Sequence, residues 1–167
     1  MANALSGARL LLAVVFPLLL LRGGAAPLVV WIVAALSDYA DGPIARRRGA
    51  VSARGAILDV VADVAFVLGG LITAASLGLV TWIAPVAIVC SVAGYVIASR
   101  RLSQDGGPRL ARSRVGHWAG VTNYACVGVV AGSLALPGAS WGMLLAAAGV
   151  VTAGINLLAV ALRIAAR

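Results

Sequence analysis

Four of the five acidic residues in this chain lie within twenty-six positions, and their spacing is typical of metal chemistry. They are Asp38, Asp41, Asp59 and Asp63, and the sequence around them is largely apolar. Residues three or four apart share one face of a helix, so Asp38 pairs with Asp41 and Asp59 pairs with Asp63. Four clustered carboxylates require cations, and ligation by oxygen alone selects hard ions such as Mg²⁺ or Mn²⁺. We therefore expect two such ions, which can clamp a displacement at phosphorus.

The same aspartates should form two tiers in a pair of antiparallel helices. Positions at one depth have a nearly constant sum of residue numbers, so Asp38 should lie level with Asp63, and Asp41 with Asp59. Asp63 follows Gly55 by eight residues, and eight residues make about 12 Å of helix. We therefore expect a recess just below a membrane surface, with Asp38 and Asp63 in the deeper tier.

The residues beside the aspartates suit a bulky phosphorylated ligand. Gly42, Ala45 and Gly55 are small, and they would let a ligand approach the backbone. Pro43 is expected to disturb its helix and to open the local structure. Arg46 could neutralise a phosphate, and it could also anchor the helix at the membrane surface.

The elements that position these residues are predicted to be transmembrane helices. The chain is 62% hydrophobic and 11% charged, whereas about a quarter of the residues in a soluble domain are charged. Only helices and closed barrels satisfy their backbone in lipid, and the apolar stretches have the length of a helical span. We predict one all-α domain over residues 1–167. Its six spans are expected at 4–21, 25–45, 55–75, 79–99, 115–136 and 140–162.

The distribution of arginine predicts the orientation. The net charge is +8, and lysine is absent. With a cytoplasmic amino terminus, twelve of the thirteen arginines would be cytoplasmic and only Arg22 would lie outside. The positive-inside rule therefore favours a multi-pass protein of the cell membrane, N-in and C-in, with the aspartate recess facing the cytoplasm. Because the arginines lie between apolar segments, we expect no nucleic-acid partner.

Aromatic residues and the first span add two further expectations. Trp31, Trp82 and Trp141 would lie near the outer membrane interface, and Trp118 near the inner one. The segment LLLAVVFPLLLL, followed by GGAA, has an alternative interpretation as a cleaved signal peptide. Cleavage would leave five spans and would put the two ends of the chain on opposite sides.

The aspartate stretch also resembles a known signature. Its pattern, D-x2-D-G-x2-A-R-x8-G-x3-D-x3-D, is similar to that of the CDP-alcohol phosphatidyltransferase family. The eight fixed positions are matched by Asp38, Asp41, Gly42, Ala45, Arg46, Gly55, Asp59 and Asp63. The segment NALSGAR resembles the amino-terminal element of the family, through Asn3, Ser6 and Arg9. This second resemblance argues against cleavage of the first span, and the family has six transmembrane helices and a cytoplasm-facing site.

The resemblance implies a transferase of phospholipid synthesis. An acceptor hydroxyl would attack the phosphorus next to the lipid alcohol of a CDP-alcohol, such as CDP-diacylglycerol, and CMP would leave. Asp38, Asp41 and Asp59 would bind metal, and Asp63 would be the general base and could also be a metal ligand. The residues expected to contact the donor are Asn3, Ser6, Arg9, Asp41, Gly42, Ala45, Arg46 and Gly55.

The resemblance also implies a homodimer. Gly69, Gly70 and the last span, which is rich in glycine and alanine, could serve close helix packing and dimerisation.

A second basic region suits a phosphorylated acceptor. In a six-helix bundle the loop after the fourth span lies beside the aspartates, and guanidinium groups bind phosphate well. Acceptor contacts are expected from Arg100, Arg109, Arg112, Arg114 and His117. Glycerol 3-phosphate or inositol phosphate would fit such a site. The segment SRVGHWAGVT loosely resembles the members that accept glycerophosphate, with His117 where these often carry a basic residue.

A membrane protein with clustered carboxylates could have three other functions. Intramembrane prenyltransferases also use aspartate motifs and Mg²⁺, but they are longer and their two motifs lie far apart. A cation or proton transporter would continue its polar groups toward the outer face, whereas no charged residue follows Asp63 until the next cytoplasmic loop. A catalytically inactive scaffold would not need the complete motif.

Overall fold

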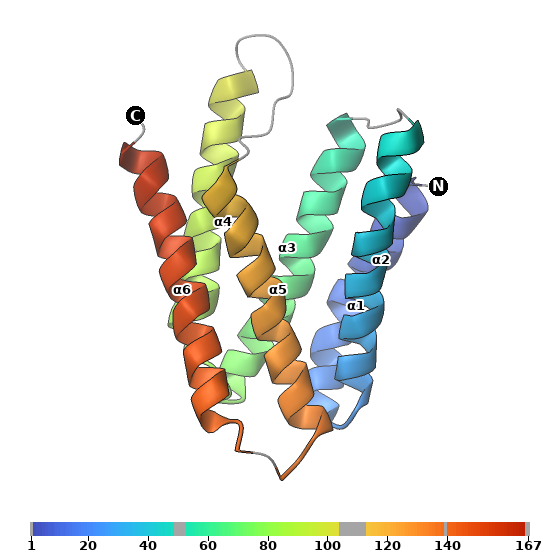
Figure 1. Cartoon of the computed structure of the whole chain (residues 1–167), viewed down its shortest axis with the longest axis vertical. Helices are drawn as coiled ribbons and strands as arrows, with labels where there is room; N and C mark the ends of the chain where they lie inside the picture. The colour runs from blue at the N-terminus through green and yellow to red at the C-terminus, as the bar shows by residue number, and fades with distance from the viewer. Residues whose placement is uncertain (1, 49–52, 104–112, 139, 166–167) are drawn as a thin grey trace.

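The computed structural model describes residues 2–48, 53–103, 113–138 and 140–165, and these ranges form six helices (Figure 1). Side chains are described except at 2–9, 38–48, 53, 54, 56 and 101–103. The helices are α1 (Ala2–Arg22), α2 (Ala26–Arg48), α3 (Ala53–Ser76), α4 (Ile83–Ser103), α5 (Arg114–Ala135) and α6 (Gly142–Ala165). The predicted all-α fold is confirmed, and each helix overlaps one of the six predicted segments.

Four of these helices contain segments long and apolar enough to cross a membrane. The segments are Ile57–Ser76, Ile83–Arg100, Arg114–Ala135 and Gly142–Ala165. Two shorter apolar segments, Leu10–Arg22 and Ala26–Ser37, lie in α1 and α2. The fold therefore fits a polytopic membrane protein, while the count of six spans and the orientation stay predictions.

The start of α4 differs from its predicted position because a tight turn precedes it. Gly78 has a φ of 72°, and the Leu79 amide donates to the Ala74 carbonyl at 2.9 Å. The Thr81 hydroxyl then accepts from the Ile83 amide at 3.3 Å, as a residue before a helix commonly does. The helix consequently begins at Ile83 rather than at residue 79.

The ends of α2 and α4 bear on two predictions about helix continuity. The helix α2 continues through Pro43 to Arg48 without ending at this proline, and a local disturbance there stays a prediction. A proline removes one backbone hydrogen bond, and the bonds of the neighbouring residues can still hold the helix. The helix α4 likewise extends to Ser103, which places Arg100 in a helix rather than in the basic loop.

The helices divide into two groups that meet along α5 (Figure 1). The helix α1 packs along α3, and both α4 and α5 pack on α6. The helix α2 packs on α5 and α1, whereas α3 makes only sparse contacts with α4 and α5. Within the described residues, α2 and α3 are antiparallel but make few direct contacts, so α1 and α5 hold these two helices in place.

An aromatic row joins the aspartate-bearing helices to α5. The ring of Phe16 lies 4.5 Å from that of Phe66, and Phe66 stacks on Tyr124 with a centroid distance of 5.6 Å. The Trp31 indole lies 6.2 Å from the Tyr124 ring, and its Nε1 donates to the Tyr124 carbonyl at 2.9 Å. Trp31 therefore faces α5 rather than serving only in an interfacial belt.

Glycines permit the closest of these approaches. A Cβ atom at Gly128 would lie 2.5 Å from Cζ2 of Trp31, and one at Gly70 would lie 2.8 Å from Cε1 of Phe16. A Cβ atom at Gly69 would lie 3.0 Å from Cγ of Pro17 in α1. Gly69 and Gly70 thus serve the packing of α1 on α3 within one chain, and the homodimer remains a prediction.

Candidate active site

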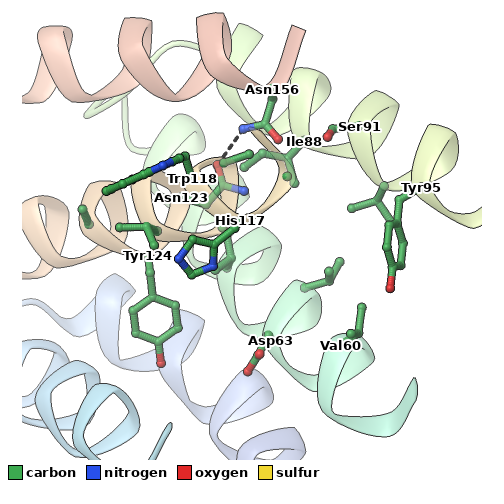
Figure 2. Close-up of a pocket in the computed structure, with 18 of the residues that line it drawn as sticks. Val60, Asp63, Ile88, Ser91, Tyr95, His117, Trp118, Asn123, Tyr124 and Asn156 are labelled. Atoms are coloured by element: carbon green, nitrogen blue, oxygen red, sulfur yellow. Dashed lines mark hydrogen bonds between the residues drawn. The ribbon is translucent and has the colours of Figure 1, made fainter. Parts of the chain in front are cut away.

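A cavity of about 1190 Å³ lies between the two groups of helices and includes Asp63 in its lining (Figure 2). Five helices, α2 to α6, contribute to it. Most of the wall is apolar. The polar and charged side chains of the lining are Asp63, Ser91, Tyr95, Ser113, Arg114, His117, Asn123, Tyr124, Asn156 and Arg163. Binding cavities for small molecules commonly measure about 300 to 1,000 Å³, so this cavity has room for more than one small headgroup.

The structure places two of the four aspartates on one turn of α3. Asp59 is exposed and Asp63 is half-buried, four residues further into the helix. Figure 2 shows Asp63 at the cavity with His117 and Tyr124 nearby. The two carboxylates are therefore arranged as the spacing predicts, with Asp63 the deeper one.

The proposed metal ligands stay predictions. Positions 38 and 41 lie in helix α2, but their side chains fall outside the described residues. Among the side chains that the structure describes, no three of the types His, Cys, Asp and Glu form a group that could hold a metal. The chemistry of Asp59 and Asp63 fits a hard divalent cation. A complete ligand set needs carboxylates from α2 as well, so the two tiers stay a prediction.

The expected donor contacts lie at one end of the bundle. Residues 42–46 are in the last two turns of α2, Gly55 is in the first turn of α3, and positions 3, 6 and 9 are near the start of α1. These three helix ends lie at the same end of the molecule (Figure 1). The side chains of Asn3, Ser6, Arg9, Asp41, Ala45 and Arg46 lie outside the described residues, so their contacts with a donor remain predictions.

Two of the five expected acceptor residues line the cavity. Arg114 and His117 are in the first turn of α5, where the Ser113 hydroxyl caps the helix by accepting from the Gly116 amide at 3.0 Å. Arg100 is exposed near the end of α4 and is not among the residues of the lining. Arg109 and Arg112 lie outside the described residues, so their acceptor role, like that of Arg100, remains a prediction.

Arg163 is a cavity residue that the sequence analysis missed. Its Nη1 donates to the Ser91 carbonyl at 2.7 Å and lies 3.4 Å from the Ser91 hydroxyl. Its Cζ is 5.7 Å from the centre of the Tyr95 ring, within the range of a cation–π contact. A Cβ atom at Gly116 would lie 3.2 Å from Nη2. The guanidinium thus lies where α4, α5 and α6 meet, and it adds a third basic group to the lining.

A pair of buried amides was also missed. The Nδ2 atom of Asn156 donates to Oδ1 of Asn123 at 2.6 Å and to the Thr152 carbonyl at 2.8 Å. Both asparagines are buried, and both line the cavity (Figure 2). The sequence indicated this pair only through one uncharged amide side chain in each of two otherwise apolar spans.

The charges of the cavity are divided between its sides. The carboxylate of Asp63 comes from α3, whereas Arg114, His117 and Arg163 come from α5 and α6. Such an arrangement can hold an anionic group on the α5–α6 side and a proton acceptor on the α3 side. A compound that has both a phosphate group and a hydroxyl group would fit these two sides of the cavity.

These features fit a polytopic membrane protein with a charged cavity between its helices. The sequence profile of the CDP-alcohol phosphatidyltransferase family matches residues 1–162, so the chain belongs to that family. It is therefore an enzyme that transfers a substituted phosphate group from a CDP-alcohol in phospholipid synthesis, and the family generally depends on a divalent cation. A comparison with curated proteins found no match. Because the chain belongs to this family, the alternative interpretations as a prenyltransferase, a transporter or a scaffold are rejected.

Proposed function

We propose that the enzyme transfers a phosphatidyl group from a CDP-diacylglycerol-type donor to a small phosphorylated alcohol and releases CMP. The observation that carries this proposal is that one cavity is lined by Asp63 on one side and by Arg114, His117 and Arg163 on the other. A phosphorylated acceptor needs cationic contacts for its phosphate and a proton acceptor beside its hydroxyl. The cavity contains both kinds of group.

In the proposed mechanism, Asp63 is the general base. Its carboxylate removes the proton of the acceptor hydroxyl, and the resulting oxygen attacks the phosphorus that carries the lipid alcohol. The new P–O bond forms as the phosphoanhydride bond to CMP breaks. A base of this kind contributes about 10²- to 10⁴-fold to the rate. Among the described residues that line the cavity, the Ser113 hydroxyl caps α5 and no hydrogen bond joins a serine hydroxyl to the His117 ring, which favours direct displacement.

A divalent cation, Mg²⁺ or Mn²⁺, would neutralise the pyrophosphate charge of the donor when bound. In the proposal two such ions are held by Asp38, Asp41, Asp59 and Asp63. The donor headgroup would lie along Gly42, Ala45 and Arg46 of α2, near Gly55 and the start of α1. Support comes from the family signature and from the shared end of the bundle at which these segments lie.

The acceptor phosphate is proposed to bind to Arg163, Arg114 and His117. A guanidinium carries five N–H donors, and one nitrogen of Arg163 is engaged by Ser91, which leaves donors for a phosphate. Glycerol 3-phosphate and inositol phosphate both have the required charge and hydroxyl groups. Arg100, Arg109 and Arg112 would supply further positive charge at the entrance.

The proposed enzyme crosses the cell membrane six times, N-in and C-in, works as a homodimer and faces the cytoplasm with its site. In Figure 1 both ends of the chain and the ends of α2, α3, α4 and α5 that adjoin the basic connectors lie at one end of the bundle. Arg22 is at the opposite end, in the last turn of α1. The arginine asymmetry supports a cytoplasmic location for the first of these ends.

The direct test is a transferase assay with purified protein. CDP-diacylglycerol and Mg²⁺ or Mn²⁺ are supplied with a set of phosphorylated and unphosphorylated alcohols, and CMP release and the lipid product are measured. We expect CMP release with a phosphorylated alcohol and a lipid that contains it. Release with unphosphorylated alcohols alone would contradict the proposed acceptor class, and no release with any alcohol would contradict the donor as well.

A further inference from the structure

The buried pair Asn123–Asn156 has hydrogen-bonding capacity that the protein leaves unused. Asn123 is 9% exposed and Asn156 is 1% exposed. Both hydrogens of Asn156 Nδ2 are engaged, by Asn123 Oδ1 and by the Thr152 carbonyl. In the part of the chain that the structure describes, Asn123 Nδ2 and Asn156 Oδ1 have no protein partner. A buried polar group without a partner costs about 1 to 3 kcal/mol, so a polar ligand or water should complete this pair.

The amide pair and Asp63 lie at similar distances along their helices from the helix ends. Asn123 is nine residues from the start of α5, Asn156 is nine residues from the end of α6, and Asp63 is ten residues from the start of α3. At 1.5 Å per residue, these positions are about 14 to 15 Å along their helices from the same end of the bundle. All three line one cavity, with Asp63 on a different side from the amides (Figure 2).

Arg163 lies on the same helix as Asn156, nearer the carboxyl-terminal end. It follows Asn156 by seven residues, which is about 10 Å along α6. Side chains on a helix slant toward its amino-terminal end, and the Arg163 guanidinium accordingly reaches Ser91, which also lines the cavity. A short ligand with its phosphate at Arg163 would therefore extend toward both the amide pair and Asp63.

The two unpaired side-chain atoms of the asparagine pair determine which chemical group of a ligand can bind there. They are one donor group, Asn123 Nδ2, and one acceptor, Asn156 Oδ1. A hydroxyl both accepts and donates, so a single hydroxyl can satisfy both atoms. An ester oxygen of a lipid only accepts, and it would leave Asn156 Oδ1 without a partner. A hydroxyl therefore fits this position better than the glyceryl ester of the donor.

We propose that Asn123 and Asn156 bind a non-reacting hydroxyl of the acceptor. This inference rests on the proposed function and adds to it a second recognised hydroxyl, besides the one at Asp63. Asn123 and Asn156 act here as specificity-determining residues. A site that hydrogen-bonds a substrate hydroxyl discriminates strongly against an analogue that lacks it, because its own polar groups are then unpaired.

The test compares acceptors that differ only in one non-reacting hydroxyl. Glycerol 3-phosphate is paired with 3-hydroxypropyl phosphate, and an inositol phosphate is paired with its monodeoxy analogues. For the pair that the enzyme uses, we expect kcat/KM of the wild-type enzyme to favour the full polyol by about 10- to 100-fold, from one or two unpaired groups. In Asn123→Leu and Asn156→Leu we expect this preference to fall to about 3-fold or less.

Thr152→Val is the matched control. Thr152 is buried at the same α5–α6 contact, and its hydroxyl lies 3.5 Å from the Thr122 carbonyl, but it does not line the cavity. The substitution should leave the preference for the polyol unchanged. If the leucine variants do not fold, Asn123→Ser and Asn156→Ser are measured instead. Serine is smaller, and its hydroxyl is too short to reach the acceptor hydroxyl. These variants should therefore show the same loss of preference.

The outcomes separate this inference from the proposed function. Equal use of both members of a pair by the wild-type enzyme would mean that water completes the amides, and it would overturn the inference. An unchanged preference in the asparagine variants would overturn it as well. CMP release only with alcohols that have a single hydroxyl would overturn it while the transferase activity stands. No CMP release with any alcohol would instead overturn the proposed function.

Discussion

The α3 side and the α5–α6 side of the cavity differ in charge and in the way they are held. The α3 side carries Asp63, and α3 is held mainly by α1, through contacts such as Phe16 on Gly70. The α5–α6 side carries cations and amides, and these two helices pack on each other. The proposed proton acceptor and the proposed phosphate site are thus supported by different helix contacts. Substitutions on the two sides should consequently have separable effects, on turnover for the first and on acceptor recognition for the second.

Removal of the metal should have the largest effect, because it acts on the acidic side as a whole. Treatment with EDTA is expected to abolish CMP release, since uncompensated carboxylates and the donor pyrophosphate repel each other. Addition of Mg²⁺ or Mn²⁺ in excess of the chelator should restore the activity. CMP release is measured before and after each addition. Full activity in the presence of the chelator would refute the dependence on a divalent cation.

The next largest effect is expected from Asp63→Asn. The substitution removes the proposed proton acceptor and should lower kcat by about 10²- to 10⁴-fold. Donor binding should change little, because most donor contacts come from other residues. Titration with the CDP-alcohol at saturating Mg²⁺, followed by turnover measurements on the same samples, separates the two quantities.

Asp59→Asn and Asp41→Asn are the comparison for that experiment. Each should weaken metal-dependent donor binding, because each removes a charged ligand. If Asp63→Asn abolishes donor binding as completely as Asp41→Asn does, Asp63 is chiefly a metal ligand. Normal turnover of Asp63→Asn would show that another group is the base.

A smaller effect, confined to the acceptor, is expected from Arg163→Gln on the basic side. A hydrogen bond to a charged group contributes about 1.5 to 3 kcal/mol, so KM for a phosphorylated acceptor should rise by about 10- to 100-fold. Binding of the CDP-alcohol should be unaffected. Arg22→Gln is the control, since Arg22 is exposed at the other end of the bundle. If Arg163→Gln weakened donor binding as much as acceptor binding, the two sides of the cavity would not have separate functions.

The smallest effect on activity is expected from Gly128→Ala, which acts on the contact between α2 and α5. The added methyl would meet the Trp31 indole and force a shift, and overpacking of this kind costs about 1 to 3 kcal/mol. We expect a lower unfolding temperature and, below it, activity within about threefold of the wild type. Gly154→Ala, where nothing lies within 4 Å of the new Cβ, is the control. A stability equal to that of the wild type would argue against close packing of Trp31 on α5.

The parts of this molecule that were predictable from sequence are those that depend on local spacing. Apolar length indicated six helices, because a helix satisfies its own backbone and needs no partner to be recognised. Asp59 and Asp63 share a turn of α3 for the same reason, since a separation of four residues fixes their relative position. Pro43 lies inside α2, as the predicted span over residues 25–45 requires, because the neighbouring backbone bonds still hold the helix.

The basic side of the cavity could not be predicted in this way, because packing assembles it from distant segments. Arg163 and Ser91 are 72 residues apart, and Asn123 and Asn156 are 33 residues apart. Arg163 was counted as one charge among the cytoplasmic arginines, and hydropathy does not show which way a side chain at a helix end points. Trp31 illustrates the same limit, since its position in α2 suggested an interface and its contacts lie on α5.

Arg163 is held by contacts within the protein itself. The Ser91 carbonyl and the Tyr95 ring restrain a side chain that would otherwise retain about 2 kcal/mol of rotamer entropy. Much of that conformational freedom is therefore lost when the helices pack, and little remains to be lost when a phosphate binds. Ser91 and Tyr95 can consequently strengthen the affinity for an anion without touching it.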